Sequence, residues 1–226
     1  MLSQLRSKPV EKRPGRGVFL CPCKKEVYTK ERFFDIIKAG QPLTLKFCAG
    51  ILDMKMDKKM EFSLRPWRES DIPSVYLYAN NPKIANNLRD VFPYPYERKD
   101  AEEYILGCIQ NEGKGQLCRA ICLQDCAIGS IGVFLGTDVY RKSAEVGYWL
   151  AEPYWGKGIM SGAISKICQE AFEVFDIVRI HAEPFAYNMG SRRALEKAGF
   201  SLEAVLKKSV VKNGVIYDSC IYALVK

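Results

Sequence analysis

The stretch LAEPYWGKGIMSGAISKI, residues 150–167, places two glycines around a lysine, between an apolar segment and a helical one. The first N–H groups of a helix have no partner within the helix and lie at the positive end of its dipole. Gly156 and Gly158 let the backbone approach a ligand with no Cβ in the way, and Lys157 adds a cation. The pattern is typical of a phosphate-binding turn. The alternative is a tight strand-to-helix turn without a ligand.

Two common phosphate loops do not fit this turn. A nucleotide P-loop needs Ser or Thr directly after its lysine, where this chain has Gly158. A dinucleotide-binding fingerprint needs a third glycine where the chain has Ser161, and no acidic residue ends the next strand. The elements around the turn must therefore decide which ligand it takes.

From residue 61 onward, predicted elements follow one another with short connections. Apolar residues recurring at helical spacing predict a helix directly after the turn, from Met160 to Phe175. Asn213-Gly214 is a strong hairpin signal between the last two strands. The predicted strands are 61–67, 116–124, 127–136, 143–150, 177–185, 209–212 and 215–225; the predicted helices are 69–80, 100–112 (capped by Asp100), 160–175 and 188–198. This order predicts an α/β fold with a mixed sheet.

Residues 61–226 resemble the GCN5-related N-acetyltransferase (GNAT) superfamily, and within it the RimJ/RimL-like branch. The segments that carry the resemblance are LRPWRESD (64–71), NLRDVFPYPY (87–96), EVGYWLAEPYWGKGI (145–159), YNMGSRRALEKAGF (187–200) and the tail VIYDSCIYALV. The resemblance implies the acyl-CoA N-acyltransferase fold, with about seven strands flanked by helices and with strands four and five splayed. It also divides the chain into a basic arm, 1–60, and an N-acetyltransferase domain, 61–226.

The resemblance implies acetyl-CoA as the acetyl donor. Its pyrophosphate would lie on the amides of Gly156–Met160, and its pantetheine arm would add to the free edge of the strand Val146–Leu150. The implied coenzyme-binding residues are Val146, Tyr148, Leu150, Trp155, Gly156, Lys157, Gly158, Ile159, Met160, Asn188 and Arg193. Two positions depart from the usual family pattern, Trp155 and Met160, and the methionine crowds the loop.

Acetyl transfer to an amine requires a neutral nitrogen, and the amine's pKa decides how much help it needs. An α-amine with a pKa of about 7.7–8.0 is roughly a tenth neutral at pH 7, whereas a lysine at about 10.4 is neutral less than about once in a thousand. Glu145, at the start of the strand that approaches the coenzyme, is the first candidate for the base. Glu183 is the substitute. His181 alternates with apolar residues, and an exposed strand histidine is the simpler interpretation of it.

Many family members use a tyrosine of the last helix to protonate the leaving thiolate, and Leu195 occupies that position here. Ser191 is the candidate replacement, with a first-turn helix residue as the alternative. Asn188 is expected to cap this helix and to bind the pantetheine. Arg192 and Arg193 are either phosphate ligands or part of a solvated helix face.

The acceptor pocket is expected beside the FPYPY loop, because aromatics and prolines together make a stiff, amphipathic wall. The alternative is that these aromatics pack under the preceding helices. The candidate substrate-binding residues are Arg89, Asp90, Phe92, Tyr94 and Tyr96.

Charge and cysteine usage limit the function classes. The net charge is +8, and residues 1–60 carry all of the excess, with 14 Lys and Arg against 6 Asp and Glu, whereas residues 61–226 carry 20 of each. A basic leader of this kind is more often a solvated arm than a nucleic-acid reader. The nine cysteines include no C-x-x-C pair, which argues against a metal site and for a reducing, cytoplasmic compartment. No apolar run is long enough to span a membrane, and no secretory signal is present.

Met54, Met56 and Met60 lie directly upstream of the regular part of the chain. One hypothesis places the true translation start among them; the other makes residues 1–53 a native accessory arm. The sequence as a whole predicts an N-acetyltransferase that moves an acetyl group from acetyl-CoA to a primary amine by direct attack in a ternary complex. The acceptor is a protein N-terminus or a small-molecule amine, and the protein is a monomer or a homodimer. The alternative is a non-catalytic module that binds or senses CoA.

Overall fold

The computed structural model describes residues 18–20, 27–29 and 61–226. The N-terminal unit contributes one antiparallel pair, β1 (Val18–Leu20) with β2 (Val27–Thr29). The rest of the predicted arm, with Met54, Met56 and Met60, lies outside the described residues. The division of the chain at residue 60 stays a prediction.

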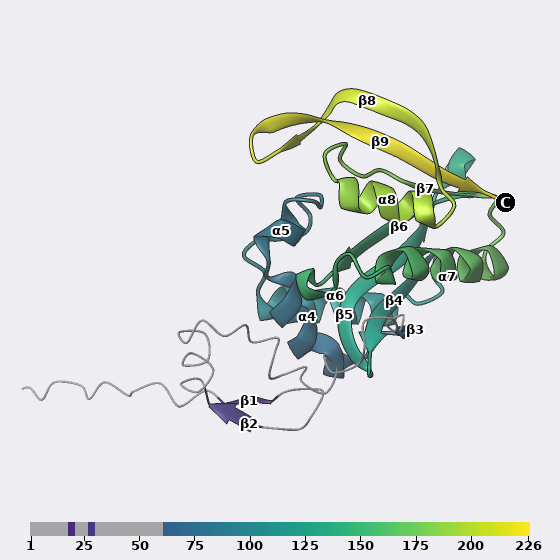
Figure 1. The fold of residues 1–226 in the computed structure, drawn as a ribbon. Helices are drawn as coiled ribbons and strands as arrows, with labels where there is room; N and C mark the ends of the chain where they lie inside the picture. Colours follow the sequence, from purple (N-terminus) through teal and green to yellow (C-terminus); the bar gives the residue numbers. More distant parts are fainter. Residues whose placement is uncertain (1–17, 21–26, 30–60) are drawn as a thin grey trace, which may run out of the picture. The chain divides into compact units, whose positions relative to one another are not determined.

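Residues 61–226 form a seven-stranded mixed sheet with helices on both faces (Figure 1). The strand order is β3-β4-β5-β6-β7-β9-β8. The strands are β3 (Ser63–Arg65), β4 (Gln116–Leu123), β5 (Cys126–Leu135), β6 (Ser143–Leu150), β7 (Arg179–Ala182), β8 (Ser201–Lys212) and β9 (Val215–Val225). The helices are α4 (Ile72–Ala79), α5 (Pro82–Ala85), α6 (Arg98–Gln110), α7 (Ile159–Val174) and α8 (Met189–Lys197), with short 3-10 turns at Glu69–Asp71, Asp138–Tyr140 and Glu152–Tyr154. The predicted mixed α/β fold is confirmed.

Two cores hold the helices on the sheet. The larger joins the α7 and α8 face to the strands through the apolar stripe of α7, including Ala163, Ile164 and Ile167. The smaller joins α4 and α6 to the other face, where Cys118 and Cys122 pack as small buried residues. The cysteines of β4 therefore have the buried, apolar role that their strand parity predicted.

Turn and cap chemistry explains several boundaries. The hairpin between β8 and β9 turns at Asn213 and Gly214, with φ values of 51° and 75°, as the Asn-Gly signal predicted. The predicted cap of α6 was wrong. Glu97 is the N-cap, and Asp100 lies three residues later, with its carboxylate accepting from the Glu97 amide at 2.6 Å. The two acidic residues form a reciprocal capping box, so the helix begins at Arg98, two residues before the predicted start.

The only parallel pair within residues 61–226 is β6 with β7, and it is short. The register joins Ser143 to Arg179 and ends at Glu145 and His181, although β6 continues to Leu150. After β7 the chain pairs with β9 instead, through an isolated bridge between Phe185 and Ser219. Within the described domain, β6 therefore has no strand neighbour on this side beyond Glu145, and the two strands diverge.

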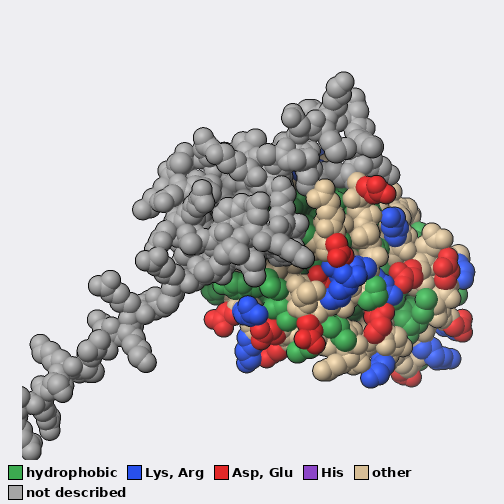
Figure 2. Space-filling model, turned by 90° about the horizontal axis from the view of Figure 1, so that it is seen from below, with side chains coloured by type: hydrophobic (Ala, Val, Ile, Leu, Met, Phe, Trp, Pro, Cys, Tyr) green, Lys and Arg blue, Asp and Glu red, His purple; other side chains and the backbone are tan. Residues whose placement is uncertain are grey.

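Charge is evenly mixed on this domain. On the face visible in Figure 2, basic and acidic side chains alternate without a large patch of either sign, in keeping with the equal numbers of each in residues 61–226. A search of the described helices finds none with the length and apolarity needed to cross a membrane.

Candidate functional site

A cavity of about 900 Å³ opens where β6 and β7 diverge. Three segments contribute most of its lining: β6 from Glu145 to Leu150, the connection from Tyr154 to Ser161, and α8 with the residues before it. Two further lining sets receive names here. The glycine wall is the connection 154–161, and the loop wall is made of Lys83, Ile84, Asn87, Leu88 and Arg89.

The glycine wall owes its shape to backbone conformation. Gly156 and Gly158 have φ values of 74° and 75°, a left-handed region that side chains disfavour, and a Cβ at either position would meet nothing within 4 Å. Gly158 is the N-cap of α7 and makes no side-chain cap bond. The first amides of α7 therefore lie at the cavity without a cap, which is the arrangement that binds anions.

Two side chains stabilise this turn. Trp155 donates from its Nε1 to the Leu150 carbonyl at 2.6 Å, which fixes the connection to the end of β6. The Lys157 ammonium lies 5.6 Å from the centroid of the Tyr154 ring. Met160 lines the cavity while packing against the larger core. The two departures from the family pattern thus both serve the packing of the wall.

The β6 strand presents a different side chain to each face of the sheet. Val146, Tyr148 and Leu150 belong to the α7 side, whereas Glu145 and Trp149 lie on the α4 and α6 side. All of them line the cavity. The cavity therefore reaches both faces of the sheet through the gap beside β6.

Glu145 forms an ion pair with Arg89 of the loop wall. The Glu145 side chain is 30 % exposed and the Arg89 side chain 66 % exposed. The sequence named Glu145 as the base and Arg89 as an acceptor-pocket residue, but it gave no signal that the two lie in contact. Their pairing places a carboxylate and a mobile cation together in the cavity.

The Tyr148 hydroxyl lies 2.8 Å from the Ser191 Oγ, and either oxygen is able to donate. Burial raises the pKa of Tyr148 above its ordinary value, so its hydroxyl keeps its proton at neutral pH. Asn188 caps α8, because its side chain accepts from the Ser191 amide at 3.1 Å. Leu195, in the usual tyrosine position, is fully buried and does not line the cavity. The protonated hydroxyl pair is the nearest structural substitute for that tyrosine.

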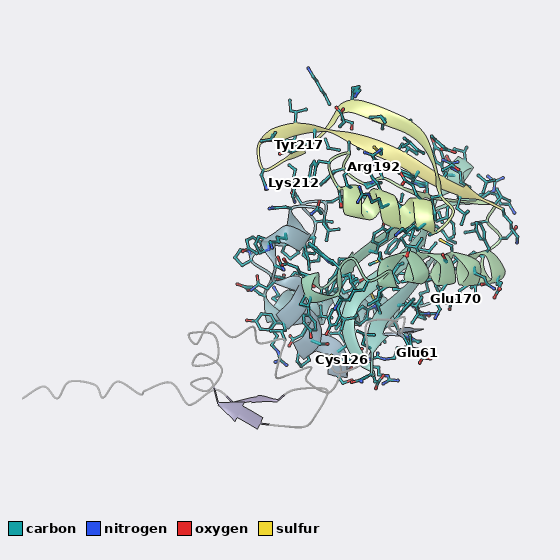
Figure 3. The ribbon with its side chains drawn as sticks, viewed as in Figure 1. Glu61, Cys126, Glu170, Arg192, Lys212 and Tyr217 are labelled. Atoms are coloured by element: carbon teal, nitrogen blue, oxygen red, sulfur yellow. The ribbon has the colours of Figure 1, made fainter. Side chains whose placement is uncertain are left out.

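The two arginines of α8 have different partners. Arg192 donates to the Tyr222 hydroxyl at 3.1 Å and to the Ala186 carbonyl at 3.1 Å, and Figure 3 labels it between α8 and the final hairpin. Arg193 lines the cavity, together with Lys197 one helical turn later. Lys197 was missed by the sequence analysis, although its spacing from Arg193 is the signal that would have found it.

The FPYPY loop lies mostly away from the cavity. Of the five candidate substrate-binding residues, Arg89 alone is among the described cavity-lining residues. Tyr96 is buried, and Phe92 packs against it and against Trp149. Tyr94 is 54 % exposed. The aromatics thus match the alternative of packing under helices, and Asp90 bonds to Lys212, as described below.

The two remaining base candidates also separate. Glu183 lines the cavity and accepts from the buried Ser219 Oγ at 2.7 Å. His181 is half-buried, is not among the cavity-lining residues, and has no hydrogen-bond partner for Nδ1 among the described residues. Burial lowers the pKa of His181. Phe185 and Tyr187 complete this side of the cavity, and no pattern in the sequence identified them.

Within the described residues, no group of three or more His, Cys, Asp and Glu side chains is arranged to hold a metal ion. Residues 61–201 match the family model described as an acetyltransferase (GNAT) domain. The chain belongs to the GNAT family. The resemblance to the RimJ/RimL-like branch is confirmed.

Three relatives show the range of similarity. YoaA of Bacillus subtilis (strain 168), an uncharacterized N-acetyltransferase, is 37% identical over 99 residues, which cover 44% of this chain and 55% of YoaA. The ribosomal-protein-serine acetyltransferase of Escherichia coli (strain K12) is 31% identical over 100 residues, 44% of this chain and 55% of that protein. The crystal structure of the microcin C7 self immunity acetyltransferase MccE, in complex with acetyl-CoA and AMP, is 28% identical with a TM-score of 0.65, over 74% of this chain and 93% of MccE. The chain spans about half the length of YoaA.

Proposed function

We propose that the protein transfers the acetyl group of acetyl-CoA to a primary amine. One observation carries this proposal: a single cavity joins the uncapped start of α7 to the Glu145 carboxylate through the gap between β6 and β7. Membership of the GNAT family and the similarity to MccE, which was solved with acetyl-CoA, support the choice of donor.

The residues present fit a coenzyme A molecule. The first amides of α7 and Lys157 would hold its diphosphate, because the helix terminus supplies unpaired donors and a favourable dipole. The free edge of β6 from Val146 to Leu150 would bond the pantetheine amides as an added strand does. Arg193 and Lys197, on one face of α8, would meet a further phosphate.

Acetyl-CoA supplies an activated acetyl thioester, and the protein supplies proton transfer and positioning. Glu145 would accept the proton that the acceptor nitrogen loses as it bonds to the acetyl carbon, directly or through one water. Ser191 would donate its proton to the sulfur as the carbon–sulfur bond breaks, and Tyr148 would replace that proton through their hydrogen bond. The products are an amide and free coenzyme A.

An α-amine or a small-molecule amine of low pKa suits this site better than a lysine side chain. Glu145 is already paired with Arg89, so it is a modest base, and an α-amine needs only a modest base. The relative from Escherichia coli that is named for a ribosomal-protein serine supports a protein N-terminus as one acceptor class. The free cysteines of the described domain agree with the proposed cytoplasmic location. The state of the protein, monomer or homodimer, stays a prediction.

The experiment uses the full chain, acetyl-CoA and a panel of amines. The panel contains peptides with free N-terminal serine or alanine, free amino acids, spermidine and an aminoglycoside, and a thiol reagent measures coenzyme A release. We expect amine-dependent release, with α-amines ahead of lysine side chains, and an acetylated product of the matching mass. Binding of coenzyme A by calorimetry without release for any amine would favour the alternative, a non-catalytic CoA-binding module. No binding at all would remove both.

A further inference from the structure

The tip of the final hairpin is joined to the loop wall by polar contacts. Lys212, the last residue of β8, donates from Nζ to the Asp90 Oδ1 at 2.7 Å. Asn213 donates from Nδ2 to the Asn86 Oδ1 at 3.0 Å, and the Tyr187 hydroxyl donates to the Asn86 carbonyl at 2.6 Å. Figure 3 labels Lys212 at the end of the hairpin that faces α5.

The Lys212–Asp90 pair is asymmetric. The Lys212 side chain is only 7 % exposed, whereas that of Asp90 is 79 % exposed. Burying an ammonium group is costly unless a partner compensates for the lost hydration. The free energy of the pair therefore favours keeping Asp90 over Lys212, and the backbone at residue 90 is held with it.

Arg89 lies directly before this anchored residue. Its own carbonyl accepts from the Phe92 amide at 3.0 Å, so the chain is fixed on both sides of Arg89. From this position its guanidinium pairs with Glu145. The contacts form a chain from the hairpin, through Asp90 and the backbone of Arg89, to the carboxylate in the cavity.

We propose that Lys212 is a positioning residue that anchors Asp90 and thereby holds Arg89 against Glu145. The inference rests on the proposed function, in which Glu145 is the base. Lys212 is not among the described cavity-lining residues, so it acts only through the loop wall. A remote contact of this kind matters because small displacements of a catalytic group lower the rate strongly.

Lys212→Met is the informative substitution. It keeps most of the apolar stem, and the Asp90 carboxylate that it leaves behind is already hydrated. Asp90→Asn would instead leave a buried ammonium without its counter-ion, and it would confuse folding with positioning. The matched control is Lys207→Met, which breaks the exposed Lys207–Asp218 pair on the same hairpin.

The first measurement is a double-mutant cycle with Arg89→Met, using the panel amine with the highest rate. Lys212→Met should lower kcat about ten-fold while leaving the KM for acetyl-CoA unchanged. In the Arg89→Met background the same substitution should have no further effect, because its target is gone. Equal losses in both backgrounds, or an unchanged kcat, would overturn the proposal. Lys207→Met should resemble the wild type.

The second measurement does not depend on an acceptor. Amide hydrogen exchange of residues 86–90 should accelerate in Lys212→Met and stay at the wild-type rate in Lys207→Met. Unchanged exchange would overturn the proposal even if the enzyme is active. Glu145→Gln separates the two claims: full activity in that variant would refute the base role of Glu145, whereas an inactive Glu145→Gln with a normal Lys212→Met would refute only the role of Lys212.

Discussion

The glycine wall and the loop wall line the same cavity but are built in opposite ways. The glycine wall is one continuous segment whose shape comes from two left-handed glycines and a helix terminus. The loop wall depends on side-chain partners from distant segments, with Arg89 on Glu145 and Asp90 on Lys212. A ligand common to a whole family is held by backbone, and the variable partner meets side chains. The comparison predicts that changes in the two walls affect different steps.

The largest effect is expected at the carboxylate that the loop wall contacts. Glu145→Gln should lower kcat by about 10²–10³, within the usual range for a general base. The affinity for coenzyme A should not change, because the glycine wall is intact. Steady-state kinetics and calorimetry measure the two quantities. Glu152→Gln is the control, since Glu152 pairs with Lys83 and is not among the lining residues. Weaker coenzyme binding in Glu145→Gln would end the division between the walls.

The glycine wall should show the reverse pattern. Gly158→Val places a branched side chain at a φ of 75°, where a non-glycine residue costs roughly 1–2 kcal/mol. Relief of that strain turns the first amides of α7, so the affinity for coenzyme A should fall about ten-fold to a hundred-fold. Gly113→Val is the matched control, because Gly113 has a φ of 74° and open space around it but lies outside the lining. Equal affinity in both variants would show that the turn does not hold the coenzyme.

A smaller effect is expected where the cavity passes between the walls. Ser191→Ala should lower kcat about ten-fold, and Tyr148→Phe should lower it less, because Ser191 is the group placed to protonate the sulfur and Tyr148 only replaces its proton. Ser165→Ala on the exposed side of α7 serves as the control. Pre-steady-state measurement of coenzyme A release checks the order. A larger loss for Tyr148→Phe than for Ser191→Ala would reverse the two roles.

The smallest effect tests whether His181 belongs to the site or to the fold. Burial lowers the pKa of His181, so the folded protein favours its neutral form. Above the ordinary histidine pKa of about 6.5, both the folded and unfolded states are neutral there. As the pH falls below that value the unfolded state gains the proton first, and stability is lost until the folded pKa is passed. His181→Gln should therefore lose less Tm than the wild type between pH 7.5 and pH 5, with kcat at neutral pH unchanged.

Local patterns predicted most of the fold. The stripe of α7 needs only its own spacing, and the Asn213-Gly214 turn needs only two residues with positive φ. The cap of α6 was placed wrongly because Asp100 and Glu97 are both acidic, and only the helical geometry decides which one precedes the helix. The FPYPY aromatics were ambiguous for a related reason. A stiff aromatic segment suits a pocket or a core equally well, and Trp149 beneath it decided for the core.

The sequence by itself determined the glycine wall, the family and the residues Glu145, Ser191 and Asn188 as candidates for the chemistry. Glycine conformations and helix termini depend on a few neighbours in the chain, so they can be identified without a fold. Only the tertiary structure decided that Arg89 pairs with Glu145, that Tyr148 meets Ser191, and that Lys212 reaches Asp90 across 122 residues of chain. Side-chain partners of this kind depend on how the sheet and its last hairpin pack, and no local pattern encodes that packing.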